Sequence, residues 1–268
     1  MSVQFRAKVL SNMQAAEGLW LMRLEAPECA RTALPGQFIM LRVAPALDPL
    51  LKRAFAVHSA EPDKGVIDIL YAVVGKGTEL LSRVRSGELL EAIGPLGRGF
   101  RIDHDRDPIL VGGGVGVAPL LLLAEHMKKS KAQVRLFYGC RSASGLAQVD
   151  AFLRLGVSVT ITTEDGSRGH EGMVTDLLLP ELMAAGIGPP PASVYACGPK
   201  QLLASVARLC RGVGVPCQVS LHPFMGCGIG ACLGCAVPRA QTEGRGLSYA
   251  KACVDGPVFD AEEVNLED

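Results

Sequence analysis

Short apolar runs separated by turn residues fill the first hundred positions of the chain. Gly and Pro break these runs at close intervals. Strands this short and this closely spaced predict a small antiparallel β-barrel. They are expected at 3–9, 19–24, 38–43, 54–59, 66–73 and 89–93. The helical spacing of Leu80, Leu81 and Val84 predicts one helix, at 78–84, among these strands.

The pattern changes near Phe100, where buried strands begin to alternate with helical segments. This alternation predicts a doubly wound domain with a parallel sheet. Strands are expected at 108–111, 133–138, 157–162 and 193–197, and helices at 119–129, 150–155, 174–179 and 200–210. The prolines at 189–191 predict a rigid turn, and from about Leu221 the chain becomes rich in Cys and Gly.

These patterns predict a multi-domain protein with three parts. Residues 1–101 are expected to form the antiparallel β-barrel, residues 102–220 the α/β domain, and residues 221–268 a small cysteine module. The composition, with 49% hydrophobic and 20% charged residues among 268, is typical of a well-packed globular protein.

Charge and targeting features narrow the function classes. The chain has 27 basic and 27 acidic residues, which argues against a general nucleic-acid binder and leaves a protein docking face open. The N-terminus lacks the apolar core of a signal peptide, and the longest apolar stretch, 111–124, falls short of the ~18 residues of a spanning helix. We therefore expect a cytoplasmic protein without a membrane segment, whose nine cysteines are thiols or metal ligands.

Four cysteines near the C-terminus have the spacing of a metal centre. Cys227, Cys232 and Cys235 read C-x4-C-x2-C, and Cys253 follows. This is the plant-type arrangement for a [2Fe–2S] cluster. A structural zinc site stays open as an alternative, although zinc ribbons use two C-x2-C knuckles and Cys253 has no near partner. Both interpretations are favoured over four unrelated buried thiols.

Three polar loops follow strands of the predicted parallel sheet. "LVGGGVGVAP" (110–119) is a strand, a glycine turn and a helix start, "YACGP" (195–199) ends another strand, and "TEDGSRGHEGMVTD" (163–176) follows a third. The carboxyl edge of such a sheet binds dinucleotides, so the loops predict a dinucleotide site. The G-x-G-x-x-G fingerprint is absent. The candidate contacts are Gly112, Gly113, Gly114, Gly116, Pro119, Asp165, Cys197, Gly198 and Pro199.

With these segments in view, the chain resembles the ferredoxin–NADP reductase superfamily and, within it, the electron-transfer subunit of NAD-dependent dihydroorotate dehydrogenase. The resemblance covers nearly the whole chain and is most specific in "GCGIGACLGC", "ACVDGPVFDAEEV" and "VVGKGTELLSRVRSGELLEAIGPLGRGF". It implies a flavin-binding barrel, a nucleotide domain and a C-terminal [2Fe–2S] module.

The resemblance also implies flavin contacts in the barrel. "KRAFA" takes the place of the family's R-P-x-S/T stretch, so Arg53 is expected to pair with the FAD pyrophosphate. The other matched positions are Ala54, Phe55, Ala56, Leu70, Tyr71, Ala72, Gly77 and Thr78. The chain departs from the family's pattern at three of these: Ala54 replaces a proline, Ala56 a Ser or Thr, and Ala72 a basic residue that is often present. A stretch that is commonly acidic and then basic reads His222-Pro223-Phe224.

The function implied by the resemblance is electron transfer between two proteins' cofactors. An FMN-containing catalytic subunit would oxidise dihydroorotate in pyrimidine biosynthesis, within a heterotetramer, and electrons would pass through the cluster and FAD to NAD(H). No acid–base or nucleophilic set is predicted in this chain. Cys197 is expected to line the nicotinamide pocket, and Asp165 either holds the nicotinamide ribose or caps a turn. Arg141 is placed where NADP-selective proteins add a basic residue, whereas the resemblance favours NAD.

Two other functions stay open from the sequence. One is the small subunit of an NADH-dependent ferredoxin:NADP or sulfide oxidoreductase, which shares the domain layout. The other is a zinc-stabilised nucleotide-binding regulatory protein without electron transfer.

Overall fold

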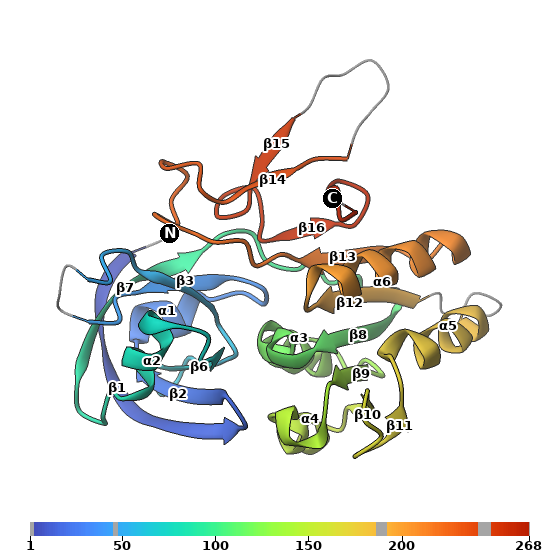
Figure 1. The fold of residues 1–268 in the computed structure, drawn as a ribbon, viewed down its shortest axis with the longest axis horizontal. Coiled ribbons are helices and arrows are strands. Elements are labelled where there is room, and N and C mark those ends of the chain that lie inside the picture. The colour runs from blue at the N-terminus through green and yellow to red at the C-terminus, as the bar shows by residue number, and fades with distance from the viewer. Residues whose placement is uncertain (1–2, 45–47, 186–191, 241–247, 268) are drawn as a thin grey trace.

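Two seven-stranded sheets and one two-stranded sheet organise the chain, which we describe from a computed structural model. Figure 1 shows the first large sheet on the left, the second on the right and the cysteine-rich segment above both. The structure describes residues 3–44, 48–185, 192–240 and 248–267. The turn expected at 189–191 lies outside these residues.

The first sheet is an antiparallel half-barrel with the strand order β4-β3-β7-β1-β2-β6-β5. Its inward side chains, among them Ile39, Ile67 and Tyr71, form a separate core. The strands are β1 (Val3–Ala16), β2 (Leu19–Glu25), β3 (Phe38–Leu41), β4 (Arg53–Ala56), β5 (Ser59–Glu61), β6 (Val66–Ala72) and β7 (Leu89–Leu96). Two short helices, α1 (Pro27–Thr32) and α2 (Lys76–Ser82), accompany them.

The single strand expected at 54–59 is two strands, because the chain changes partner there. β4 pairs with β3, whereas β5 pairs with β6. At the junction, Val57 N donates to Gln37 O at 3.0 Å and His58 N donates to Asp68 O at 2.8 Å. The backbone groups are therefore satisfied on both sides of the junction, and the sheet curves at this corner.

The second sheet has the order β11-β10-β9-β8-β12-β13-β16 and is parallel except for its last pair. Helices α3 and α4 pack on one face, and α5 and α6 on the other. The strands are β8 (Asp107–Gly113), β9 (Arg135–Cys140), β10 (Ser158–Thr163), β11 (His170–Glu171), β12 (Ala192–Cys197), β13 (Cys217–Ser220) and β16 (Val258–Asp260). The helices are η1 (Gly114–Val117), α3 (Ala118–Lys129), η2 (Ala143–Gly145), α4 (Val149–Arg154), α5 (Val174–Ala185) and α6 (Lys200–Val213).

Helix α5 continues past the residue where its sequence predicts an end. Pro180 lies inside the helix and cannot donate a backbone hydrogen bond. Leu178 and Leu182, one on each side of Pro180, are both fully buried in the core. Packing of this apolar face therefore outweighs the local preference for a helix stop.

The cysteine-rich segment is attached to both sheets. It contains β14 (Ala236–Pro238) and β15 (Tyr249–Lys251), and its last strand, β16, pairs with β13 at the edge of the second sheet. On the barrel side, a Cβ on Gly228 would lie 2.4 Å from Met40 Cγ on β3. The loop that carries the cysteines is therefore packed closely against the barrel (Figure 1).

His58 is buried between the two large sheets, and its titration makes the free energy of unfolding depend on pH. Its Nδ1 lies 2.7 Å from Ala118 O at the start of α3. Burial outweighs the opposing hydrogen bonds to Ala118 and Gln148 and lowers the pKa of His58 to about 4. Because the folded pKa lies below the unfolded value, the stabilisation is complete above about pH 6.5 and is lost as the pH falls from 6.5 to 4.

We expect His58→Asn to reduce this pH dependence. An asparagine amide can still donate to Ala118 O but does not titrate, so the variant should lose about 3 kcal/mol less stability than the parent between pH 7 and pH 4. Urea unfolding followed by circular dichroism at both pH values measures the difference. Parallel pH profiles for the two proteins would contradict the assignment of a neutral folded-state imidazole.

In the described part of the chain, no helix is both long enough and apolar enough to cross a bilayer.

Candidate functional site

Strands β4 and β6 of the barrel carry most of the predicted flavin residues, and alternation divides their side chains between two environments. Phe55 and Tyr71 point into the barrel core, where their rings meet edge to face at 5.5 Å. Tyr71 Oη donates to Asn12 Oδ1 at 2.9 Å, and burial raises the pKa of Tyr71 to about 12. Leu70 and Ala72 instead pack toward the second sheet. The face that β6 turns to the second sheet is therefore apolar, and the tyrosine hydroxyl is engaged inside the barrel.

The side chain of Arg53 lies across Gly77 in the first turn of α2. A Cβ on Gly77 would lie 2.8 Å from Arg53 Nε and 3.1 Å from Cζ, so only glycine leaves room for the guanidinium here. Arg53 Nη1 donates to Leu51 O at 2.5 Å. Among the described residues, no carboxylate pairs with Arg53. The site therefore combines an unpaired, half-buried cation with a close approach of backbone, which suits an anionic ligand.

Thr78 caps the same helix with its hydroxyl. Its Oγ1 accepts from Val74 N at 2.9 Å and from Gly75 N at 3.2 Å, and donates to Gly75 O at 3.0 Å. The hydroxyl is thus used within the turn, and its part in the site is to hold the loop before α2 in place.

The glycine loops after β8 and β12 are packed against each other at the carboxyl edge of the second sheet. A Cβ on Gly113 would lie 2.5 Å from Leu202 Cδ2 and 3.0 Å from Pro199 Cδ. A Cβ on Gly116 would lie 2.4 Å from Cys197 O. Gly112 on β8 is paired with Cys197 on β12, and Gly198 lies against Gly113. Gly114 has a φ of +52°. Pro119 is buried in the first turn of α3. The structure therefore brings two of the three predicted loops together.

Substitution of Gly116 by alanine is expected to damage this junction. The added methyl would meet backbone atoms of Cys197 and Gly198, which cannot rotate away, so the variant should lose about 1–3 kcal/mol of stability and bind NAD(H) more weakly. Gly212→Ala is the matched control, because Gly212 lies exposed in α6 with nothing within 4 Å of an added Cβ. That variant should gain up to about 1 kcal/mol in urea unfolding. Equal urea midpoints of unfolding for Gly116→Ala and Gly212→Ala would contradict this close packing of the loops.

Asp165 lies apart from the two packed loops. It follows β10, which is separated from β12 by β9 and β8, a distance of about 14 Å at the usual strand spacing. Its Oδ1 accepts from Ser167 N at 3.0 Å and from Ser167 Oγ at 2.5 Å, and these hydrogen bonds lower the pKa of Asp165. These hydrogen bonds are those of a turn cap, one of the two roles considered from the sequence.

The four cysteines of the C-terminal module form two sulfur pairs. Cys235 Sγ and Cys253 Sγ lie 3.2 Å apart, and the Cys227 and Cys232 side chains contact each other. A single tetrahedral ion takes all of its ligands around one point. Two pairs instead match a two-iron cluster, in which each iron takes two thiolates.

The loop around Cys227 favours a thiolate. Ile229 N and Cys232 N each lie 3.4 Å from Cys227 Sγ and donate to it. Desolvation raises the pKa of Cys227, but these N–H groups and that of Ala231 outweigh it and lower the pKa to about 6. Gly228 and Gly230 have φ values of +75° and +85°, which turn the backbone around the sulfur. The donor set therefore fits an iron–sulfur cluster.

Sequence reasoning missed one contact at the edge of the second sheet. His222 Nε2 lies 3.1 Å from Cys197 Sγ and 3.5 Å from Ser220 Oγ. The position of His222 two residues beyond the end of β13 is the only signal in the sequence, and it becomes visible only once β13 is known to lie beside β12.

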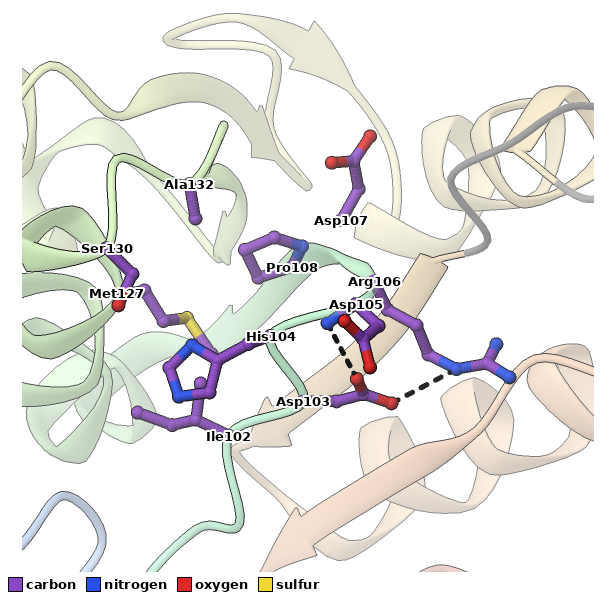
Figure 2. A pocket seen from close by; sticks show the side chains of 10 residues that line it. All are labelled: Ile102, Asp103, His104, Asp105, Arg106, Asp107, Pro108, Met127, Ser130 and Ala132. Carbon is purple, nitrogen blue, oxygen red and sulfur yellow. Dashed lines mark hydrogen bonds and ion pairs between the residues drawn. The ribbon is translucent and has the colours of Figure 1, made fainter.

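Two hollows lie outside these sites or at their border. One of about 210 Å³ lies at the opposite end of β8, where Asp103 accepts from Asp105 N at 3.0 Å and pairs with Arg106 (Figure 2). It is remote from the glycine loops, which follow the other end of β8. The other, of about 340 Å³, lies between the end of β7 and the cysteine loop and is lined by Arg98, Ile229 and Cys253 among others.

Comparison with known families matches each part of the chain. Residues 222–265 match the model described as the iron–sulfur cluster binding domain of dihydroorotate dehydrogenase B. Residues 110–208 match an oxidoreductase NAD-binding domain, and residues 7–100 match an oxidoreductase FAD-binding domain.

Similar proteins extend over the full chain. The dihydroorotate dehydrogenase B (NAD(+)) electron transfer subunit of Desulforamulus reducens is 39% identical, with 100% of both chains covered. That of Caldanaerobacter subterraneus is 41% identical over 97% of this chain and 98% of its own. Among solved structures, an NADH-dependent reduced ferredoxin-NADP oxidoreductase superposes with a TM-score of 0.85 at 30% identity, covering 97% of this chain and 90% of that one.

Proposed function

The chain belongs to the family of dihydroorotate dehydrogenase B (NAD(+)) electron transfer subunits, and from this we propose that it carries electrons between a dihydroorotate-oxidising catalytic partner and NAD(H). When bound together, FAD and a [2Fe–2S] cluster supply the exchange between an electron pair, moved as a hydride, and single electrons. The observation that carries the proposal is the two sulfur pairs, three of whose four cysteines lie on a loop packed against β3, the neighbour of the flavin strand β4.

Arg53 is proposed to hold the pyrophosphate of FAD. Its guanidinium has no carboxylate partner among the described residues and lies over Gly77, where backbone N–H groups begin α2. A planar guanidinium binds phosphate oxygens in pairs, which fixes orientation as well as charge. Leu70 and Ala72 offer the apolar surface toward the second sheet on which a flavin ring system can lie.

NAD(H) is proposed to bind at the carboxyl edge of the second sheet. Close packing of Gly113, Gly116 and Gly198 fixes the two loops in place. Gly114 lies open, with nothing within 4 Å of an added Cβ, and so leaves the backbone accessible, as a pyrophosphate requires. Cys197 is the last residue of β12, beside these loops, and is assigned to the part of the site that binds the nicotinamide. Asp165, three strand spacings from β12, is assigned to the cap of its own turn and not to the nicotinamide ribose.

The cluster is proposed to be held by Cys227 and Cys232 on one iron and by Cys235 and Cys253 on the other. This assignment follows the two contacts between sulfur atoms. Exposed apolar side chains surround the loop: Phe224 is 95%, Ile229 58% and Leu233 62% exposed. We assign this surface to the catalytic partner, because it is continuous with the cysteine loop, where electrons from the partner would enter this chain.

The partner is proposed to contain FMN and to form a heterotetramer with this chain, and the complex is proposed to work in the cytoplasm. The names of the similar proteins support a catalytic partner, since each is an electron transfer subunit. The FMN of the partner and the assembly of two copies of each subunit are inferred from the family resemblance.

Anaerobic co-purification with the candidate partner tests the proposal. We expect one FAD and two irons with two acid-labile sulfides per chain, visible absorbance that NADH bleaches, and bleaching by dihydroorotate only when the partner is present. A preparation that holds zinc and no flavin would contradict it. So would co-purification with a large glutamate-synthase-like flavoprotein in place of a dihydroorotate-oxidising subunit.

A further inference from the structure

The pair formed by Cys197 and His222 lies where two parallel strands end side by side. Cys197 is the last residue of β12, and its register partner on β13 is Ser220. His222 follows two residues later and turns Nε2 back to 3.1 Å from Cys197 Sγ. Ser220 Oγ lies 3.5 Å from the same nitrogen. Three polar side chains therefore meet at one point of the sheet edge.

The direction of the hydrogen bond follows from the burial of the thiol. Cys197 is fully buried, and burial raises its pKa to about 12, so the sulfur is protonated at neutral pH. The S–H group donates, and Nε2 accepts with its lone pair. His222 is then the tautomer that carries its proton on Nδ1. Loss of solvent around the ring lowers the pKa of His222 to about 4, so the imidazole is neutral at physiological pH and Nε2 can accept.

The pair borders the loops assigned to NAD(H). Cys197 is paired with Gly112 on β8, and a Cβ on Gly116 would lie 2.4 Å from Cys197 O. The thiol therefore lies at the carboxyl ends of β8 and β12, the two strands that lead into the glycine loops. A thiol without an acceptor can rotate among three staggered positions, whereas an acceptor at hydrogen-bond distance selects one.

We propose that His222 is a positioning residue for hydride transfer, which acts through Cys197 by holding the thiol in one orientation against the nicotinamide. This inference rests on the proposed function, which places the nicotinamide at this sheet edge. Neither side chain gains or loses a proton in the step: the hydride passes between the nicotinamide and the flavin, and the imidazole and thiol set the geometry.

The test compares His222→Leu with His222→Gln in the complete FAD- and cluster-containing protein. Leucine removes the acceptor, whereas the glutamine amide reaches as far as Nε2 and can accept the S–H. In anaerobic rapid mixing with NADH, the limiting rate of flavin reduction should fall about 10-fold in His222→Leu while the apparent Kd for NADH changes less than about 3-fold. His222→Gln should stay within about 3-fold of the parent on both measures.

Two further readouts separate positioning from a general structural effect. The long-wavelength absorbance that NAD+ produces on binding to the reduced protein should weaken in His222→Leu and return in His222→Gln. The double variant Cys197→Ala, His222→Leu should be no slower than Cys197→Ala alone, because both changes remove the same hydrogen bond. Cys197→Ser keeps a donor to Nε2 and should resemble the parent.

Two results would overturn the inference while leaving the proposed function intact. One is an unchanged limiting rate and absorbance band in His222→Leu, and the other is additive losses in the double variant. A parent protein that holds no FAD, or that NADH fails to bleach, would instead refute the proposed function. If His222→Leu does not fold, Cys197→Ala against Cys197→Ser makes the same comparison.

Discussion

Replacement of Cys253 by serine is expected to abolish electron exchange with the catalytic partner while leaving flavin reduction by NADH nearly unchanged. Cys253 Sγ lies 3.2 Å from Cys235 Sγ, and this pair is assigned to one iron. Loss of groups that merely support a metal ligand costs about 10–100-fold in metal affinity, so loss of the ligand itself should cost at least about 100-fold. Iron and acid-labile sulfide analysis, together with dihydroorotate-driven NAD+ reduction, measure the two effects.

Cys217→Ser is the control for this variant. Cys217 is half-buried on β13 and belongs to neither sulfur pair. It should retain full iron and full turnover. A Cys253→Ser protein with two irons per chain and undiminished coupling to the partner would show that the cluster is held by other residues.

Replacement of Gly77 by alanine is expected to weaken FAD binding by about 10–100-fold, the range that corresponds to losing a charge-assisted hydrogen bond. The added Cβ would lie 2.8 Å from Arg53 Nε and force the guanidinium out of its place over α2. Titration of FAD into flavin-free protein, followed by flavin fluorescence, gives the dissociation constant.

Gly75→Ala makes the matched comparison, two residues earlier in the same loop. Nothing lies within 4 Å of a Cβ at Gly75, and its φ of 169° is extended backbone that any residue adopts. It should bind FAD like the parent. Arg53→Ala should equal Gly77→Ala, and the double variant should be no weaker than either, since one contact is removed in all three. Independent losses would mean that Arg53 does not act through this contact.

Apolar periodicity predicted most strands of the barrel and the four strands β10, β9, β8 and β12 of the second sheet, but not β11, β13 or β16. The barrel strands and the strands that alternate with helices are where the chain buries continuous apolar faces, and such faces depend on local sequence alone. The cysteine spacing likewise indicated a two-iron centre, because three of the four ligands lie on one loop. Comparison with known families confirms the flavin, nucleotide and iron–sulfur parts in that order.

Features that depend on distant residues could not be read from the sequence. The contact between His222 and Cys197 requires β13 to lie beside β12. The two residues are 25 positions apart in the chain, with α6 between them. The role of Asp165 depended on strand order, which puts three strand spacings between it and Cys197. Helix α1 was missed because it is only six residues long, although Pro27 occupies its first turn.

The attachment of β16 to β13 makes the edge of the nucleotide sheet depend on residues that follow the whole cysteine segment. A chain emerging from the ribosome completes β13 at residue 220 and then adds the whole cysteine segment before 258–260 can pair with it. Until then β13 presents an open row of backbone donors and acceptors, the kind of edge at which nascent chains aggregate. The cysteine module therefore also protects the nucleotide sheet, because β16 pairs with the strand that would otherwise be left open.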